Sequence, residues 1–211
     1  MTPSPANSGK LFTIGHSNLE LAEFLGFLVQ HEVHIVCDVR SRPGSFRFPQ
    51  FNREPLEAGL AAVKIQYQFC GEALGGRPDD PRVYREDGLV DYVARRKSPD
   101  FCTGVDRAME LSRSSNIALM CAEEDPLQCH RFLMICPALL DRGAEPMHIR
   151  KGGILESQRA AEDRLLDLRG FADVTSTSLF SFGRADALVD ALREQANEYA
   201  FRTSPEAIEY F

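Results

Sequence analysis

The stretch LFTIGHSNLELAEFLGFL, residues 11–28, places a short apolar run directly before a helical pattern. Residues 11–16 are mostly apolar and end at a glycine and a histidine, which is typical of a buried strand. Ser17 and Glu20 have the spacing of a capping box, so we predict that a helix begins here. The apolar residues of this helix recur on one face, namely Leu21, Phe24, Leu25 and Leu28. The unit is a strand followed by a helix that covers one face of a sheet.

The same alternation of strand and helix continues along the chain. Further short apolar runs, bounded by turn-forming residues, lie at 34–39, 65–69, 116–121 and 146–150. Between them, helices are predicted to begin near Asn52 and at Ser98, where Pro99 suits the first helical position. Such alternation is typical of a largely parallel sheet that is covered by helices on both faces. We therefore predict an α/β fold over residues 11–150, with a mostly parallel, Rossmann-like sheet.

The sequence becomes more polar and helical after residue 150. Two helical patterns, 154–168 and 184–197, are joined by a Thr/Ser-rich connector at 175–178. The second pattern has one apolar face, made of Leu188, Val189 and Leu192. We predict a C-terminal helical extension over 151–211, which packs on the α/β domain or forms a subunit contact.

Composition and charge limit the classes of protein to which the chain can belong. At 211 residues, 44% of them hydrophobic, it can bury one substantial core. No apolar run approaches the roughly 18 residues of a membrane span, and the first ten residues contain no apolar secretion signal. We therefore expect a cytoplasmic protein without a membrane partner, whose six cysteines are reduced thiols. The net charge of −7 argues against wholesale nonspecific binding of nucleic acid, but it leaves room for a local basic patch.

Ionisable and polar side chains lie at the ends of four predicted strands. Ligands of open parallel sheets bind outside the carboxyl ends of the strands, so these side chains are candidate site residues. They are His16, Ser17, Asp38, Arg40, Ser41, Tyr67, Cys121 and Glu123. Some have structural interpretations as well: Ser17 as the helix cap, Asp38 as an acceptor for loop amides, His16 as a structural hydrogen-bonding group. Their convergence at one edge favours a functional site.

The loop after the second predicted strand is both basic and aromatic. Residues 40–53 contain four arginines, Arg47 among them, and no acid, interleaved with three phenylalanines. Arginines beside aromatic rings suit a phosphate, a nucleobase or a single strand, because charge neutralisation and stacking act together. The structural alternative is a solvated loop held in place by its phenylalanines.

The stretch ALMCAEEDPLQCHR, residues 118–131, combines two cysteines, a histidine and an arginine with three acids. The Asp-Pro pair at 125–126 suits the start of a helix, whose second turn would hold Cys129, His130 and Arg131. In a helix, adjacent side chains point about 100° apart, and Cys129 would fall on a buried stripe. A zinc site would use Cys121, Cys129 and His130, with His16 as a fourth candidate ligand, but the sequence has no second pair of CxxC type. We therefore predict no metal site and no cofactor.

Two further residues of this stretch are site candidates. Cys121 ends a strand just before the predicted helix N-terminus, where partial positive charge lowers a thiol pKa, so it is a candidate nucleophile, a redox thiol or a buried residue. Arg131 is predicted to reach back to the helix start and to form an anion site together with Arg40. The alternative for Arg131 is a salt bridge with one of the neighbouring acids.

A set of linked motifs resembles one known family. In chain order the motifs are TIGHS (13–17), DVRSRP (38–43), PQFN (49–52), Tyr67 with LGGRP (74–78), and ALMCAEEDPLQCHR (118–131). Together they span about residues 11–150 and resemble the domain of unknown function 488 family, whose name supplies no reaction. The resemblance implies that the family's motif positions are here His16, Ser17, Asp38, Arg40, Ser41, Cys121, Glu123, Cys129, His130 and Arg131.

These observations favour an enzyme that acts on an anionic substrate, such as a nucleotide or a nucleic-acid end. His16 or Asp38 would move a proton, Glu123 would orient or polarise, and Cys121 is the fourth catalytic candidate. The substrate-binding candidates are Ser17, Arg40, Ser41, Arg47, Tyr67, His130 and Arg131. A noncatalytic nucleotide or nucleic-acid binding module is the first alternative, and a thiol-based redox protein is the second. The sequence leaves the substrate, the reaction and the oligomeric state open.

Overall fold

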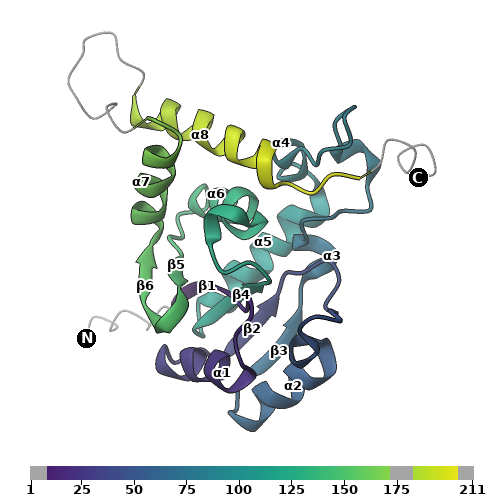
Figure 1. Cartoon of the computed structure of the whole chain (residues 1–211), viewed down its shortest axis with the longest axis vertical. Coiled ribbons are helices and arrows are strands. Elements are labelled where there is room, and N and C mark those ends of the chain that lie inside the picture. Colours follow the sequence, from purple (N-terminus) through teal and green to yellow (C-terminus); the bar gives the residue numbers. More distant parts are fainter. Residues whose placement is uncertain (1–8, 172–182, 204–211) are drawn as a thin grey trace, which may run out of the picture.

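The computed structural model describes residues 9–171 and 183–203 of the chain. Their strands form one six-stranded sheet in the order β3-β2-β4-β1-β5-β6 (Figure 1). The strands are β1 (Leu11–Gly15), β2 (Ile35–Asp38), β3 (Gln66–Phe69), β4 (Ile117–Cys121), β5 (Met147–Ile149) and β6 (Leu155–Ser157). Neighbouring strands are parallel except for β5 and β6. The predicted α/β fold with a mostly parallel sheet is confirmed, and its Rossmann-like character stays a prediction.

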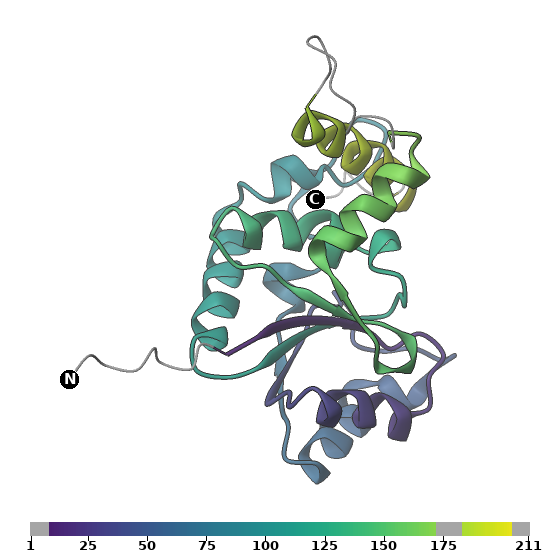
Figure 2. The ribbon, with the colours of Figure 1, turned by 90° about the vertical axis from the view of Figure 1, so that its left-hand side faces the viewer.

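Helices lie on both sides of the sheet. The longer ones are α1 (Leu21–Gln30), α2 (Arg53–Ala62), α5 (Pro99–Ser112), α7 (Gln158–Leu168) and α8 (Arg184–Tyr199). The short helices and turns are η1 (Pro49–Phe51), α3 (Gly71–Leu74), η2 (Pro81–Val83), α4 (Tyr92–Arg95), η3 (Pro126–Gln128), η4 (Arg131–Ile135), α6 (Cys136–Leu140) and η5 (Lys151–Gly153). Figure 2 shows α1 and α2 on one side of the sheet, and α5, α6 and α7 on the other. Within the described ranges, no helix is long and apolar enough to cross a membrane.

The central strand β4 separates two apolar cores. All five of its residues are buried. Ala118 and Met120 pack into the core beneath α1 and α2, whereas Ile117, Leu119 and Cys121 pack into the core on the other face. Alternate residues of a strand point to opposite faces, so this register directs Cys121 toward the side of the sheet that carries η3 and η4.

The first helix begins later than its capping pattern predicts. Its N-cap is Glu20, which makes no side-chain capping bond, and the helix starts at Leu21. Ser17 instead adopts a left-handed backbone conformation with φ 44°. Its N–H donates to the carbonyl of Ala122 at 2.7 Å. The capping box was therefore a wrong prediction, because Ser17 belongs to a turn that joins the ends of β1 and β4.

The starts of the next two long helices agree with the sequence prediction. Asn52 is the N-cap residue of α2, and Ser98 precedes Pro99 at the first position of α5. The side chain of Asn52 does not cap its own helix. Its Oδ1 accepts the Ser45 N–H at 2.6 Å, which closes the basic loop back onto the start of α2.

The segment after residue 150 differs in part from the prediction. Residues 155–157, predicted to be helical, form β6, which adds an antiparallel edge strand to β5. In α8 the buried residues are Ala187, Ala191 and Gln195, whereas Val189 is 62% exposed. Leu188 and Leu192 of the predicted apolar face are partly buried against the core beside these buried residues, so Val189 is the one residue of that face that does not pack. The connector 175–178 lies outside the described residues, and the division into domains at residue 150 stays a prediction.

Candidate functional site

A cavity of about 790 Å³ lies at the carboxyl ends of β1, β2 and β4. His16, Arg40 and Cys121 line it from the ends of these strands or directly after them. The residues around η3 contribute further groups, and Tyr199–Arg202 closes one side from the end of α8. The volume is in the range of small-molecule sites, and the position is the one at which parallel sheets bind ligands.

The wall of this cavity is strongly basic. Five arginines line it, namely Arg40, Arg42, Arg47, Arg77 and Arg202, against a single carboxylate, Glu123. Arg40 pairs with Asp38, and Arg202 pairs with Asp87. The other three arginines form no ion pair with any residue that the structure describes. In a chain with a net charge of −7, the cavity is a local concentration of positive charge.

Arg40 is held in place by a buried carboxylate. Asp38 Oδ1 accepts from Arg40 Nε at 2.9 Å, and Oδ2 accepts from Nη2 at 2.6 Å. The hydroxyl of Tyr67 donates to Oδ2 at 3.0 Å. Asp38 is fully buried, and neither Asp38 nor Tyr67 lines the cavity. Asp38 is thus placed to position Arg40, and its geometry does not favour the proton-transfer role expected from the sequence.

His16 lies beside Arg40 as a neutral ring. It is buried and stacks on Phe51, with the ring centroids 4.2 Å apart. Burial, together with the charge of Arg40, lowers the pKa of His16 to about 4. Nδ1 lies 2.9 Å from the carbonyl of Ser17 and acts as the donor, which leaves Nε2 as an acceptor 3.3 Å from Arg40 Nη1. His16 therefore presents an uncharged ring to the cavity at neutral pH.

The predicted residues of the basic loop are joined to the LGGR segment. Ser41 Oγ accepts the N–H of Arg77 at 2.9 Å, which connects the two loops at the cavity wall. The guanidinium of Arg47 lies 5.4 Å from the ring of Phe48, and that of Arg77 lies 4.7 Å from the ring of Phe201. Each ring packs against one side of its arginine. Neither arginine has a carboxylate partner among the described residues.

The chain between β4 and α6 differs from the helix predicted there. Asp125 caps as expected, because its Oδ1 accepts the Leu127 N–H at 3.0 Å. The resulting turn ends at Gln128, since Cys129 is extended, with φ −136° and ψ 141°. A helical course resumes at His130 with a π-helical turn, Arg131–Ile135. The prediction that residues 129–131 share one helical turn was wrong.

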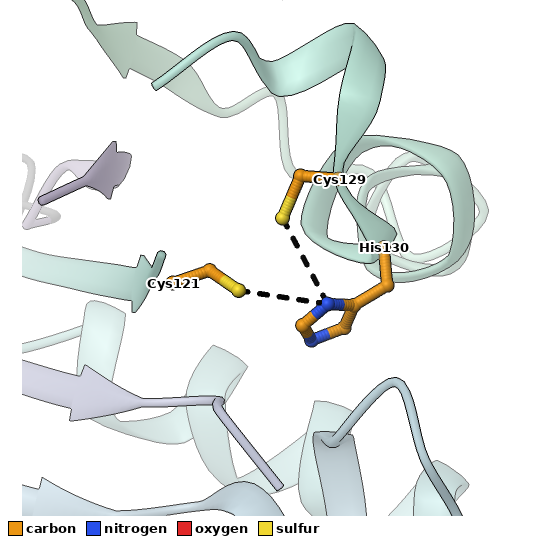
Figure 3. A group of neighbouring side chains, drawn as sticks. All are labelled: Cys121, Cys129 and His130. Carbon is orange, nitrogen blue, oxygen red and sulfur yellow. Dashed lines mark hydrogen bonds between the residues drawn. The ribbon is translucent and has the colours of Figure 1, made fainter. Parts of the chain in front are cut away.

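The break at Cys129 brings two cysteines and a histidine together. Nδ1 of His130 lies 3.7 Å from Cys121 Sγ and 3.8 Å from Cys129 Sγ (Figure 3). All three side chains are buried, and their ligand atoms lie within 4.8 Å of one another. The angular argument against a metal site assumed helical geometry at Cys129, so it does not apply. These three residues, the Cys-Cys-His cluster, could hold a metal ion.

A glycine and a carbonyl fix the orientation of His130. Nε2 lies 3.0 Å from the carbonyl oxygen of Val39 and donates to it. The backbone of Gly76 packs on the ring, where an added Cβ would lie 2.9 Å from His130 Cγ. The LGGR motif therefore lets the backbone approach this histidine. His130, predicted as a substrate-binding residue, has its Nδ1 directed at the sulfurs.

The two thiols of the cluster differ in acidity. Burial opposes ionisation of Cys129, but the hydrogen bond from Cys121 and the charges of Arg131 and His130 lower its pKa well below the usual range. The hydrogen bond to Cys129, together with burial, raises the pKa of Cys121. The sequence placed the acidic thiol at Cys121, and the structure places it at Cys129. The exposed Glu123 has its Oε2 3.1 Å from Cys121 Sγ, at the edge of the cluster.

Arg131 does not join Arg40 in an anion site. It is fully buried and does not line the cavity. Its Nη1 donates to the carbonyl of Glu123 at 2.5 Å, and its Nη2 donates to the carbonyl of Glu124 at 2.7 Å. The side chains of the neighbouring acids are not its partners, since Glu124 pairs with Arg150. The predicted anion site and its salt-bridge alternative are both wrong, because Arg131 braces the loop after β4 through backbone oxygens.

Several lining residues were not among the sequence candidates. Among them are Arg42, Arg77, Tyr92, Phe201 and Arg202. Arg42 lies within the basic loop and Arg77 within the LGGR segment, so these two motifs could have identified both arginines as site candidates. The residues after α8 carry no such signal, because their approach to the cavity depends on how the chain returns from that helix.

Comparison with known proteins assigns the chain to a family. No curated protein matches the chain, and no solved structure does. Residues 20–135, more than half of the chain, match the model of the family described as a domain of unknown function, DUF488. The matched segment contains Arg40 and the whole Cys-Cys-His cluster. The chain therefore belongs to the domain of unknown function DUF488 family.

Proposed function

We propose that the protein is an enzyme that acts on an anionic, phosphate-containing substrate, such as a nucleotide or a nucleic-acid end, bound in the arginine-lined cavity. The observation that carries this proposal is the charge of the wall, where three of the five arginines have no ion pair among the described residues and Glu123 is the one carboxylate that lines the cavity. A guanidinium group offers paired N–H donors that match the oxygens of a phosphate group. A cavity of this size and charge suits a compact anion better than a neutral or cationic ligand.

The arginines differ in how they would contribute to binding. Arg40 is already fixed by Asp38, so binding to it costs little side-chain freedom. Arg42, Arg47 and Arg77 form no ion pair with the described residues, and their charge is available to a ligand. We propose that Arg40 sets the position of the anion and that the other three neutralise it.

Groups with chemical reactivity favour an enzyme over a simple anion receptor. The cavity wall contains the Cys-Cys-His cluster, the neutral His16 and the carboxylate of Glu123. A protein that only holds an anion gains nothing from an acidic thiol, and a carboxylate beside the site weakens binding. His16 and Glu123 are the groups on this wall that could carry a proton during a reaction. All six cysteines are free, which suits the reducing conditions of the cytoplasm.

Calorimetric titration with inorganic pyrophosphate and with a nucleoside triphosphate tests the proposal. We expect Arg77→Ala to weaken binding about tenfold, the effect of losing one charge-assisted contact. The matched control is Arg113→Ala, since Arg113 is also exposed but follows α5 at the opposite edge of the sheet. Equal affinity of the parent and the Arg77 variant for both anions would contradict an anion site in this cavity.

A second candidate function is binding of single-stranded nucleic acid without catalysis. The observation that favours it is Phe46, which is fully exposed between Arg42 and Arg47. An exposed ring between guanidinium groups can stack on a base while the arginines contact phosphates. Fluorescence anisotropy with short single-stranded oligonucleotides separates the two candidates. If Phe46→Ala weakens oligonucleotide binding and leaves pyrophosphate affinity unchanged, the binding module is favoured. If the affinities for both the oligonucleotide and pyrophosphate stay unchanged, the enzyme with a small-anion cavity is favoured.

A further inference from the structure

Three buried side chains direct their ligand atoms at one point beside the arginine-lined cavity. They come from the end of β4 and from the break between η3 and η4, eight and nine residues apart in the chain. His130 Nδ1 lies almost equally far from both sulfurs, at 3.7 Å and 3.8 Å. A single proton can lie along only one of these two lines. A cation between the three atoms would interact with all of them at once.

The separations match the dimensions of a tetrahedral zinc site. With Zn–S near 2.3 Å and Zn–N near 2.0–2.1 Å, tetrahedral angles place a sulfur and a nitrogen ligand about 3.6 Å apart. The two observed nitrogen–sulfur distances are within a few tenths of an ångström of that value. Two thiolates and an imidazole are also a donor set that zinc prefers. The side chains therefore need little movement to bind the ion.

The surroundings of His130 are those of a metal-binding histidine. A metal-bound imidazole usually donates its second N–H to a carbonyl or carboxylate, which fixes the ring and the tautomer. Here Nε2 donates to the carbonyl of Val39, and Nδ1 is left for the cluster. Gly76 packs on the ring and holds its plane. Both contacts come from loops that also form the cavity wall.

The backbone around the cluster departs from regular helix where the three side chains need it. The extended conformation of Cys129 turns its sulfur and the His130 ring toward the same point. The π-helical turn follows directly, and such turns occur often at functional sites. Arg131 ties the loop after Cys121 to this turn through two carbonyl oxygens. The cluster is thus braced on both sides.

We propose that Cys121, Cys129 and His130 bind a zinc ion whose fourth coordination position opens into the arginine-lined cavity. All three residues line that cavity, and the described residues supply three ligands to the cluster. Three protein ligands with an open position are the arrangement of catalytic zinc sites, whereas structural sites have four. The proposal does not depend on which anion the cavity binds.

Binding of the ion balances charge and protons. Two thiolates and one neutral imidazole give zinc a site with no net charge, which suits burial. Zinc binds thiolates and a neutral imidazole, so protons on these three groups must leave when the ion enters. Its binding should therefore release protons and weaken as the pH falls.

Reconstitution of the full chain with cobalt(II), followed by zinc competition, tests the site. We expect one cobalt per chain, sulfur-to-cobalt charge-transfer absorption, and the strong visible bands of tetrahedral cobalt, all removed by one equivalent of zinc. Cys121→Ser, Cys129→Ser and His130→Gln should each lose most of the affinity. The control is Cys102→Ser, because the Cys102 thiol donates to the carbonyl of Arg96, away from the cluster. An absorption spectrum that does not change when cobalt is added, or cluster variants that bind cobalt as tightly as the parent, would overturn the proposal.

A measurement on the unaltered protein covers the case in which a cluster variant does not fold. Alkylation of the zinc-loaded protein is compared with alkylation of the metal-free protein. Zinc should slow the reaction of two of the six cysteines, and mass spectrometry should identify them as Cys121 and Cys129. The competing explanation is a redox pair, which would form a Cys121–Cys129 disulfide under mild oxidation. If zinc neither binds to the reduced protein nor protects a cysteine, the zinc site is overturned. A Cys121–Cys129 disulfide on mild oxidation would then favour the redox pair.

The open position has its own test. Azide added to the cobalt-loaded protein should shift the visible bands, because a small anion can enter an accessible coordination position regardless of substrate. Spectra that do not respond to azide would show four protein ligands and a closed site. Failure of the pyrophosphate titration, with one cobalt bound and an azide response present, would refute the proposed substrate class and leave the metal site standing.

Discussion

Asp38 accepts hydrogen bonds from the Arg40 guanidinium with both carboxylate oxygens, and the two residues are two positions apart in the chain. Asp38 has no contact with solvent. Asp80 and Arg82 form the same two-pronged pair at the same spacing, but Arg82 is 86% exposed. The chain therefore contains one motif in two dielectric environments. The two pairs differ in burial and in the Tyr67 hydroxyl, which donates to Asp38.

The first prediction uses this comparison. Asp38→Asn should lower the free energy of unfolding by about 3 kcal/mol, because it leaves the Arg40 guanidinium buried without its counter-charge. Asp80→Asn should leave the unfolding free energy almost unchanged, since solvent and salt screen an exposed pair. Urea unfolding of the three proteins measures both effects. Similar losses in the two variants would show that burial does not decide the value of the pair.

The second prediction concerns the glycine that packs on His130. Gly76→Ala should weaken cobalt binding about tenfold or more, because the new methyl group displaces the ring that carries Nδ1. Gly26→Ala, in α1, is the control, since an added Cβ there meets no atom within 4 Å. It should stabilise the fold by about 0.5–1 kcal/mol and leave cobalt binding unchanged. Unaltered cobalt affinity in the Gly76 variant would argue against a required ring position.

The third prediction assigns Arg131 to the fold rather than to the ligand. Arg131→Lys should lower the free energy of unfolding by about 2 kcal/mol, because one ammonium group cannot replace the fork that bonds the Glu123 and Glu124 carbonyls. Pyrophosphate affinity should change much less than in Arg77→Ala. Thermal or urea unfolding with parallel calorimetry provides the two numbers. A variant of unchanged stability that had lost its anion affinity would restore Arg131 to the binding site.

The fourth prediction is a pH dependence that originates at His148. The ring is buried, with Nδ1 2.8 Å from Thr13 Oγ1 and Nε2 3.1 Å from Gln158 Oε1. Burial, and then the charge of Arg131, lower the pKa of His148 from 6.5 to about 4. The unfolded chain therefore takes up a proton near pH 6.5 that the folded protein refuses until about pH 4. Stability contributed by the neutral ring is present above pH 6.5 and is lost as the pH falls toward 4.

This shift predicts a difference of about 3 kcal/mol between pH 7 and pH 4, at 1.36 kcal/mol per pKa unit. His148→Asn removes the titrating group, so its unfolding free energy should fall less over that range than the parent's. Carboxylates and His16 titrate in both proteins and cancel in the comparison. The exposed His34→Asn variant should follow the parent. Parallel pH profiles of the parent and the His148 variant would contradict the buried neutral ring.

The sequence predicted the sheet well because its strands carry local signals. Five predicted runs became β1 to β5 with boundaries shifted by a residue or two. The signal is strongest in β1, β2 and β4, which are buried throughout, since burial on both faces demands continuous apolar stretches. Strand β6 has the residues Leu-Glu-Ser, which carry no such signal. It forms because the edge of β5 is free to pair, and that condition depends on tertiary structure.

The candidate site was predicted in location but not in chemistry. His16, Arg40 and Cys121 do meet at one edge, as the strand ends require. The convergence of Cys129 on His130 could not be foreseen, because it depends on one extended residue inside a helical pattern. The role of Arg131 was also out of reach, since backbone carbonyls accept its hydrogen bonds and leave no pattern in the sequence.

The return of the chain after α8 brings a late part of the sequence to the cavity wall. Residues 199–202 close one side of the cavity, yet they lie outside the segment 20–135 that the family model matches. The arginine fixed by Asp38 and the Cys-Cys-His cluster all lie inside that segment. A combinatorial library confined to residues 199–202 should therefore alter which ligands fit while the reactive groups stay intact. For directed evolution, this short stretch is the natural place to begin.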